Sequence, residues 1–118
     1  MTSHIRVHAE HAVSEGKLDE FRKMAAEMIH QVEANEPNYL SYEWFLSDDE
    51  DTCHIIGLFK DSEAVMAHLA NIGEMMGPFS EIAPATGIEL YGNPSDELRE
   101  AVAPFGAKIS EHWNGFTR

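Results

Sequence analysis

Cysteine and long apolar runs are scarce in this sequence. Cys53 is the only cysteine among 118 residues, which excludes an intrachain disulfide and a metal cluster built from several thiolates. No apolar run approaches the roughly 20 residues that cross a bilayer, and residues 1–8 lack the apolar core of a signal peptide. We therefore expect a soluble protein of the cytoplasm.

Basic residues are scarce as well. The chain has Lys+Arg 8 against Asp+Glu 21, a formal net charge of -13. Nucleic acids and anionic lipid surfaces bind to positively charged surfaces, so the composition disfavours both as partners. The acidic excess favours solubility, and the length suits one domain with a single core.

The apolar pattern predicts strand, helix, strand, strand, helix, strand, then a short helix and a tail. The expected strands are 5–13, 39–47, 53–60 and 86–92, and the expected helices are 17–35 and 62 to about 73–77, followed by an irregular stretch over 75–85. Asp61 or Ser62 is the expected cap of the second helix, and Ser95 caps the short one. This order is that of an α+β fold, the ferredoxin-like split β-α-β pattern with an antiparallel sheet.

The two strands of the predicted hairpin are apolar on both faces. Strict alternation places Leu40, Tyr42, Trp44 and Leu46 on one face, and Tyr39 and Phe45 on the other. An antiparallel sheet with helices on one face and water on the other should alternate more clearly. Two apolar faces need two covers, so we predict a homodimer whose sheets face each other.

One histidine interrupts an apolar helical stripe. His68 shares its face of the second predicted helix with Val65, Leu69, Ile72, Met75 and Met76, and such a stripe normally faces a core. An imidazole there must find a hydrogen-bond partner, bind a ligand or take part in chemistry. A histidine that is simply paired within the core remains the structural alternative.

Seven short segments occur in a suggestive order and spacing: Glu15-Gly16-Lys17-Leu18-Asp19-Glu20-Phe21, Asn35-Glu36-Pro37, Tyr42-Glu43, His54-Ile55-Ile56, Phe59-Lys60-Asp61-Ser62-Glu63-Ala64, His68-Leu69 and Glu89-Leu90-Tyr91-Gly92. Together they resemble the antibiotic biosynthesis monooxygenase (ABM) domain family of the dimeric α+β barrel superfamily. The resemblance covers residues 4–93, and the remainder is similar to the extension of a quinol monooxygenase-like subgroup. We expect an ABM-like ferredoxin-fold domain over 1–93, and over 94–118 a short helix and tail that pack on the same domain or on the partner subunit.

The resemblance implies a dimeric α+β barrel with a pocket between the sheet and helices of each protomer. It further implies a monooxygenase, an oxidoreductase that oxidises a small hydroxylated aromatic such as a quinol or anthrone with O2, without metal, flavin or haem. Because the family is functionally mixed, a non-catalytic dimeric binding or stress-response domain, a haem-binding or haem-degrading protein and an isomerase stay open as alternatives. The sequence departs from the haem-degrading members: the first strand lacks asparagine, and no tryptophan precedes the histidine in the second helix.

Cofactor-free oxygenation needs a base, a substrate that forms an electron-rich anion and a dry cavity. His68 is the predicted catalytic base, because burial keeps an imidazole neutral. The predicted substrate-binding residues are Trp44, Tyr42, Asn71, His54, Met75 and Phe79. Each can instead be an ordinary core, interface or surface residue, and His54 joins the pocket only if its strand face is the inner one. His4 and His8 share a strand face without a third ligand, so no metal site is predicted.

Overall fold

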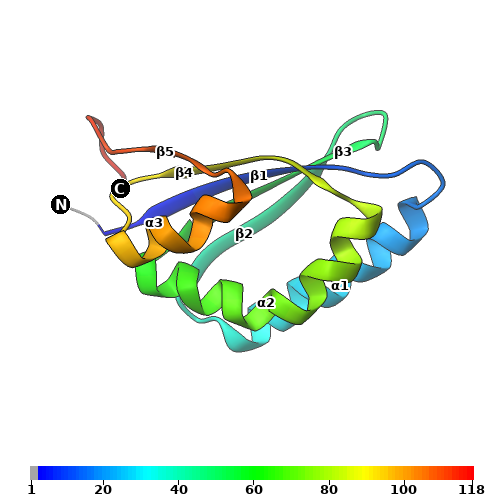
Figure 1. The fold of residues 1–118 in the computed structure, drawn as a ribbon, viewed down its shortest axis with the longest axis horizontal. Coiled ribbons are helices and arrows are strands. Elements are labelled where there is room, and N and C mark those ends of the chain that lie inside the picture. Colours follow the sequence, from blue (N-terminus) through cyan, green and yellow to red (C-terminus); the bar gives the residue numbers. More distant parts are fainter. Residues whose placement is uncertain (1–2) are drawn as a thin grey trace.

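The computed structural model describes residues 3–118, and its helices pack on one face of a single sheet (Figure 1). The elements in chain order are β1 (Ile5–Ala12), α1 (Leu18–Asn35), β2 (Tyr39–Leu46), β3 (Thr52–Phe59), α2 (Ser62–Ile82), β4 (Ala85–Tyr91), α3 (Asp96–Val102), the 3-10 helix η1 (Ala103–Phe105) and β5 (Lys108–Ser110). The predicted element order is confirmed.

The sheet has the strand order β2-β3-β1-β4-β5. Strand β3 lies between β1 and β2 and pairs antiparallel with both, which is the split β-α-β arrangement. Strand β4 pairs antiparallel with β1, and only β5 runs parallel to its neighbour, β4. The predicted α+β, ferredoxin-like fold class is therefore confirmed, with an open sheet whose edges are β2 and β5.

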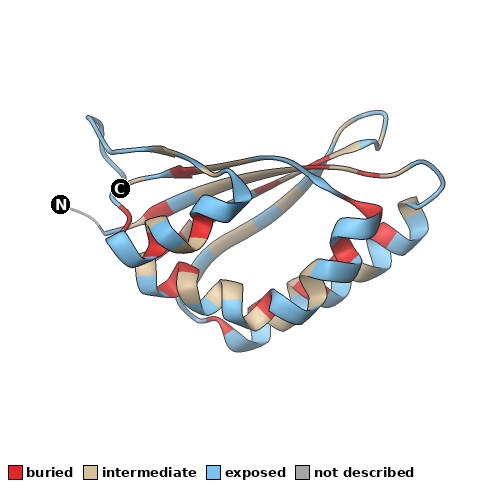
Figure 2. Ribbon diagram, viewed as in Figure 1, coloured by how far each residue is buried: buried red, intermediate tan, exposed pale blue. Residues whose placement is uncertain are grey.

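The apolar spacing of the sequence explains which surfaces are buried. In α1 the residues Phe21, Ala25, Met28 and Val32 recur at helical intervals and face the sheet. Buried positions accordingly gather where the helices meet the sheet (Figure 2). Helix α2 begins as predicted, because the Asp61 carboxylate accepts a hydrogen bond from the backbone N–H of Ala64 at 2.9 Å.

Helix α2 is longer than the sequence predicts. An end near Gly73 or Gly77-Pro78 is wrong, because the helix continues to Ile82 with Pro78 inside it. Phe79 is 1% exposed and Ile82 is 7% exposed, so the last turns bury large apolar side chains. Their burial outweighs the lost hydrogen bond and the steric cost of an internal proline. The predicted irregular stretch over 75–85 is accordingly helical for most of its length.

A β-bulge alters the predicted faces of β2. The pairing of β2 with β3 shifts register between Tyr39 and Ser41, so Leu40 is an extra residue in the strand. Tyr39 therefore lies on the helix-facing side, with its ring 4.6 Å from that of Tyr42. The strict alternation that grouped Tyr39 with Phe45 is wrong at this point.

The face of the sheet away from the helices, called the outer face below, is chemically mixed. Strand register places the apolar residues Phe45, Ile56 and Leu58 on it, together with the charged or polar residues Arg6, His8, Glu10, Glu43, His54, Glu89 and Lys108. Phe45 is 47% exposed and Ile56 is 50% exposed. The outer face thus carries large apolar side chains that no other element of residues 3–118 covers.

The C-terminal segment contributes to the same core. Helix α3 buries Leu98 and Val102 in a cluster with Ile5, Phe59 and Leu90. Further on, Arg6 on the outer face donates to the Thr117 hydroxyl at 2.9 Å, and the intervening Trp113 is 92% exposed. Across residues 3–118 none of the helices combines the length and apolarity required to cross a membrane.

Candidate functional site: a buried glutamate–histidine pair

His68 is paired with a buried carboxylate. Its Nδ1 lies 3.1 Å from Glu36 Oε1 and 3.0 Å from Glu36 Oε2. The side chains are 12% and 5% exposed, so the pair is largely withdrawn from water. Because a carboxylate only accepts, Nδ1 carries the shared proton, and Nε2 of the neutral ring keeps its lone pair. The ring is thereby held in the tautomer that can accept a proton at Nε2.

The turn after α1 and a second donor hold the Glu36 carboxylate in place. Glu36 is the C-cap of α1, with its backbone N–H bonded to the Val32 carbonyl, and Pro37 prevents the helix from continuing. Asn71, one turn beyond His68 on α2, donates from Nδ2 to Glu36 Oε2 at 2.7 Å. Gln31 of α1 in turn donates to the Asn71 carbonyl at 3.0 Å. The end of α1 therefore carries the carboxylate, and α2 supplies both of its side-chain hydrogen-bond partners.

Burial sets the protonation of His68. Loss of solvation lowers the pKa of His68 below 6.5, and the hydrogen bond and charge of Glu36 partly oppose this change. We expect the neutral ring at neutral pH, because taking an imidazolium out of water costs more than the single carboxylate returns. A neutral, oriented imidazole is suited to accept a proton.

Aromatic rings surround the imidazole. The ring centroid of His68 lies 4.9 Å from Tyr39, 5.8 Å from Tyr42 and 5.5 Å from Phe59. Burial raises the pKa of both tyrosines well above the usual phenol value, with Glu36 adding to the increase. Both phenols therefore stay protonated and can donate hydrogen bonds.

Further aromatic rings extend from Tyr42 along the sheet, and Tyr42, Trp44 and Phe79 are together called the aromatic wall below. The Trp44 ring lies edge-on to Tyr42 at 5.8 Å and to Phe79 at 5.6 Å. Its indole N–H is buried and has no hydrogen-bond partner of normal geometry among residues 3–118. The same N–H points towards the Tyr42 hydroxyl closely enough to oppose the rise in the pKa of Tyr42. A buried donor of this kind is costly unless a ligand or water satisfies it.

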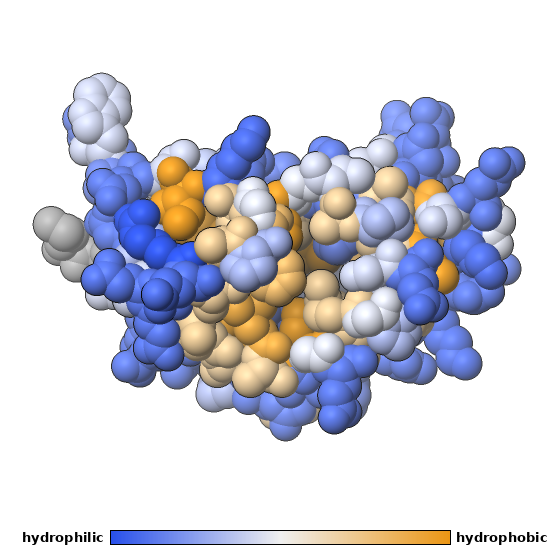
Figure 3. All heavy atoms as spheres, in the orientation of Figure 1, coloured by the Kyte–Doolittle hydropathy of each residue, from blue (hydrophilic) through white to orange (hydrophobic). Residues whose placement is uncertain are grey.

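The core divides into two clusters, and Tyr39 packs against both of them. One centres on Phe21, Ile72 and Phe79, and the other on Phe59, Leu90 and Leu98. Several apolar residues that pack against one or the other cluster are only partly buried: Val7, Ala9, Leu69, Met76 and Ile88. The space-filling view is hollowed between the sheet and the helices, with apolar side chains around the hollow (Figure 3).

A surface cavity also borders the buried pair. It has a volume of about 430 Å³ and is lined by the 35–39 turn and the first turns of α2. Glu36, Tyr39 and Asn71 contribute to its wall, whereas His68 does not. The glutamate thus lies between this cavity and the histidine.

The structure brings together most of the residues singled out in the sequence. Tyr42, Trp44, Phe79 and Met75 lie on the helix side of the sheet with His68. Asn71 is also there, but its amide is engaged by Glu36 and Gln31.

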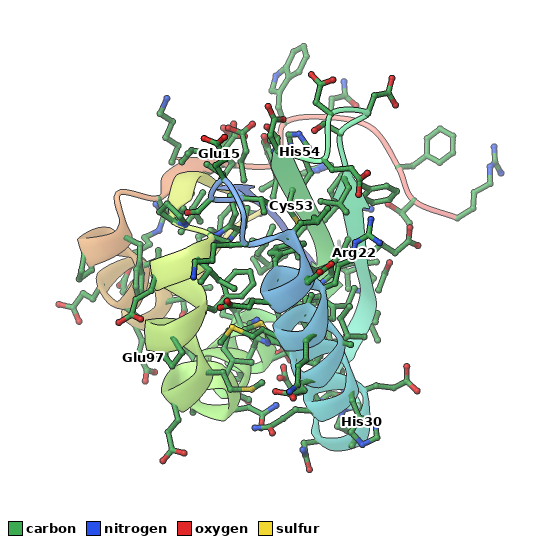
Figure 4. All side chains as sticks on the ribbon, turned by 90° about the vertical axis from the view of Figure 1, so that its right-hand side faces the viewer. Glu15, Arg22, His30, Cys53, His54 and Glu97 are labelled. Carbon is green, nitrogen blue, oxygen red and sulfur yellow. The ribbon has the colours of Figure 1, made fainter. Side chains whose placement is uncertain are left out.

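His54 does not join this group. It lies on the outer face, where its Nδ1 is 2.9 Å from His8 Nε2, and His8 Nδ1 is 3.1 Å from Glu89. The neighbouring Cys53 points to the helix side instead (Figure 4). We expected His54 to line the pocket only if its side of β3 faced the helices. The strand register places His54 on the outer face, so it does not line the pocket.

The outer-face histidines form no recognisable metal centre. Within residues 3–118 no group of three or more His, Cys, Asp or Glu side chains has a metal-binding arrangement. Cys53 is buried, and loss of solvation raises the pKa of its thiol to about 11, so a thiolate is disfavoured.

Two residues of the site were missed by sequence reasoning, Glu36 and Tyr39. A glutamate at a helix end is usually solvated, so only its position just before Pro37 marked it. Tyr39 was misplaced because a bulge cannot be read from alternation. Gly57, which is paired with Tyr42, was the one available signal in the sequence, because a glycine within a strand often marks the close approach of another group.

Comparison with known protein families gives one decisive match. The model of the antibiotic biosynthesis monooxygenase family matches residues 4–73, more than half of the chain. This chain belongs to the ABM family. The match includes Glu36, Tyr39, Tyr42, Trp44 and His68. A comparison with curated proteins gives no match.

Solved structures support the same fold for this ABM protein. It is similar to MupZ from Pseudomonas fluorescens, with 22% identity, a TM-score of 0.91, and coverage of 100% of this chain and 91% of that one. It is similar to a proposed antibiotic biosynthesis monooxygenase from Caulobacter crescentus, with 24% identity, a TM-score of 0.67 and coverage of 75% and 88%. A variant of SnoaB, a cofactor-independent oxygenase from Streptomyces nogalater, gives 15% identity, a TM-score of 0.67 and coverage of 80% and 96%. At these identities the similarity concerns the fold alone.

Proposed function

We propose that this ABM protein is a cofactor-independent monooxygenase acting on a small hydroxylated aromatic, such as a quinol or an anthrone. The observation that carries the proposal is the buried pair formed by Glu36 and His68 within a shell of aromatic rings. Membership of the ABM family and the fold shared with SnoaB support the reaction class.

His68 removes the substrate proton in this proposal. The C–H or O–H bond of the substrate breaks, its electron pair stays on the substrate, and the proton moves to His68 Nε2. The imidazolium that forms is stabilised by the Glu36 carboxylate, which already accepts the Nδ1 proton. A carboxylate held behind a histidine orients the ring and stabilises its charged form, as in the serine protease triad.

The substrate anion then supplies the electrons. It transfers one electron to O2, and the two radicals combine into a carbon-bound peroxide that takes back the proton from His68. When the O–O bond breaks, the remaining C–H bond at that carbon breaks as well. One oxygen stays as a new carbonyl, and the other leaves as water with the hydrogen from that C–H bond and the proton returned by His68. For an anthrone the product is a quinone, and the atoms balance without an external reductant.

The aromatic wall binds the substrate and excludes water. Tyr42, Trp44 and Phe79 provide flat apolar surfaces, and Met75 is a flexible neighbour at the rim. Apolar surroundings keep bulk water from protonating the substrate anion before it meets O2. Asn71 acts through Glu36 rather than on the substrate in this scheme.

The proposed working unit is a homodimer with facing sheets. The exposed Phe45 and Ile56 on the outer face provide apolar surface for a second copy. The bond between Arg6 and Thr117 holds the end of the tail against the same face, which would bring exposed Trp113 close to the partner.

Oxygen uptake tests the proposed function. Purified protein is incubated with a panel of anthrones and quinols in an oxygen electrode, after dialysis against a chelator. We expect substrate-dependent uptake that His68→Ala abolishes, while the matched variant His30→Ala, at an exposed position on α1, retains it (Figure 4). No uptake by the wild-type protein over the whole panel overturns the proposal.

A further inference from the structure

We propose that Tyr39 is a second catalytic residue, whose hydroxyl donates a hydrogen bond to the substrate oxygen that becomes negatively charged, and that Gly57 positions it. This inference rests on the proposed function, because it concerns the same site, and it narrows the substrate class to molecules with a phenolic or enolisable oxygen. Neither residue is one that the sequence pattern assigns to the site.

Gly57 provides the space in which the Tyr39 hydroxyl lies. A side-chain carbon built on Gly57 overlaps the Tyr39 hydroxyl and lies 2.6 Å from Cε1 and 2.8 Å from Cζ of the ring. Real side chains do not approach so closely, so any residue other than glycine displaces the phenol. The Tyr39 ring therefore extends from the edge strand β2 across β3, with its hydroxyl on the floor of the sheet.

The neighbouring rings prevent Tyr39 from moving elsewhere. Its ring is stacked on Phe59 with centroids 3.7 Å apart, and it lies edge-on to His68 at 4.9 Å. Tyr42 closes another side at 4.6 Å. The bulge at Leu40 directs the side chain into this position, so backbone and packing fix the hydroxyl before any substrate binds.

The hydroxyl lies over Gly57, beside a part of the sheet that is only partly buried. Gly57 is paired with Val7 of β1, and Val7 is only partly buried where it packs against the cluster of Phe59 and Leu90. Among residues 3–118 the Tyr39 hydroxyl forms no hydrogen bond with protein. Burial raises the pKa of Tyr39, and the nearby Tyr42 and Glu36 raise it further through their charges. The phenol is therefore a preformed donor with its proton available.

The two groups act on one substrate oxygen. When the O–H bond of a phenol breaks, its proton goes to His68 Nε2 and its electron pair stays on oxygen. Tyr39 then donates its own proton into a hydrogen bond with that oxygen without releasing it. A donor aimed at developing negative charge in a dry site stabilises the anion more than the neutral phenol.

Binding of 4-nitrophenol tests this role independently of turnover with oxygen. Its ionised form is coloured, so the ratio of bound phenolate to bound phenol is measured directly over a pH series on the full-length protein. We expect Tyr39→Phe to lower that ratio about tenfold, the loss of one hydrogen bond to a charged oxygen. Gly57→Ala should change the ratio in the same direction, because the added methyl group displaces the hydroxyl.

Matched variants separate this role from folding. Tyr91→Phe removes a hydroxyl on the outer face, and Gly73→Ala adds a methyl group where nothing lies within 4 Å, so both should keep the wild-type ratio. An unchanged ratio in folded Tyr39→Phe, or wild-type protein that binds no 4-nitrophenol, overturns the inference. Phenolate binding that depends on Tyr39 without any oxygen uptake supports the inference while the proposed oxygenase function fails.

Discussion

Glu36 and His68 are 32 residues apart in the chain, yet His68 Nδ1 lies 3.0 Å from the Glu36 carboxylate inside the fold. The end of α1 supplies the acid and the middle of α2 supplies the imidazole. A buried carboxylate of this kind is costly unless it accepts hydrogen bonds, and Asn71 and His68 both donate to it. The arrangement would stabilise the charged form of His68 in the proposed reaction.

Replacing Glu36 by glutamine should shift the pH dependence of the proposed oxygenase activity. The carboxylate raises the pKa of His68, so its loss should lower that pKa further and move the acidic limb of the kcat/KM profile to lower pH. At neutral pH we expect kcat/KM to fall at least about tenfold, because the imidazolium loses its partner. Glu33→Gln, an exposed position on α1, is the matched control, and an identical pH profile for both variants would contradict a role for Glu36.

Acid should destabilise the fold through His11. This residue is 4% exposed, donates from Nδ1 to the Ala83 carbonyl at 2.8 Å, and has its pKa lowered from 6.5 by burial. The pKa of His11 is lower in the folded than in the unfolded state. Its contribution to the free energy of unfolding is therefore fully present above pH 6.5, and it is lost as the pH falls towards the folded pKa. The loss is at most about 1.4 kcal/mol per pH unit for each such histidine.

Urea unfolding between about pH 7.5 and pH 5 measures this dependence. In His11→Asn the amide can still donate to Ala83, but the titrating group is gone, so the slope with pH should become shallower. His68 contributes in the same direction and accounts for part of the remaining slope. An equally steep slope in His11→Asn would show that other groups control acid unfolding, and His30→Asn serves as the exposed control.

A charge at the centre of the outer face should dissociate the proposed dimer. Ile56 is 50% exposed and lies beside His8 in the strand register. Ile56→Glu would bury an unpaired carboxylate between two acidic chains, which costs several kcal/mol in a closed interface, about 3–5 for an uncompensated charge. Light scattering should give the mass of two chains for wild type and of one for Ile56→Glu, while Ala26→Glu on α1 stays dimeric. A monomeric wild-type mass contradicts the dimer itself.

Removing the internal proline should stabilise α2. Pro78 is exposed and donates no backbone hydrogen bond, so its replacement by alanine restores one bond and removes a steric conflict in the helix. We expect the free energy of unfolding to rise by about 1–3 kcal/mol in chemical denaturation. Gly77→Ala, at a position with nothing within 4 Å, should add about 0.5–1 kcal/mol. A decrease for Pro78→Ala would mean that the packing of Phe79 requires the backbone geometry that proline imposes at this position.

The sequence by itself determined the element order and the buried faces of most elements. Helical spacing in α1 and alternation in β1 depend on side-chain period alone, which neighbouring residues set. The same local information placed His68 on an apolar face and Asp61 and Ser95 at helix starts. The end of α2 escaped prediction because Pro78 and Gly77 are local signals, whereas the burial of Phe79 and Ile82 is a tertiary one.

Only the tertiary structure decided what surrounds His68. The partner Glu36 comes from another helix, Tyr39 reaches the site through a bulge and the space at Gly57, and strand pairing removes His54 to the other face. Each of these depends on contacts between segments far apart in the chain. A hydrophobic period specifies which side of an element is buried, but not which buried polar groups will meet there. Their meeting is decided by packing, because a buried donor or acceptor is stable only where the fold provides its partner.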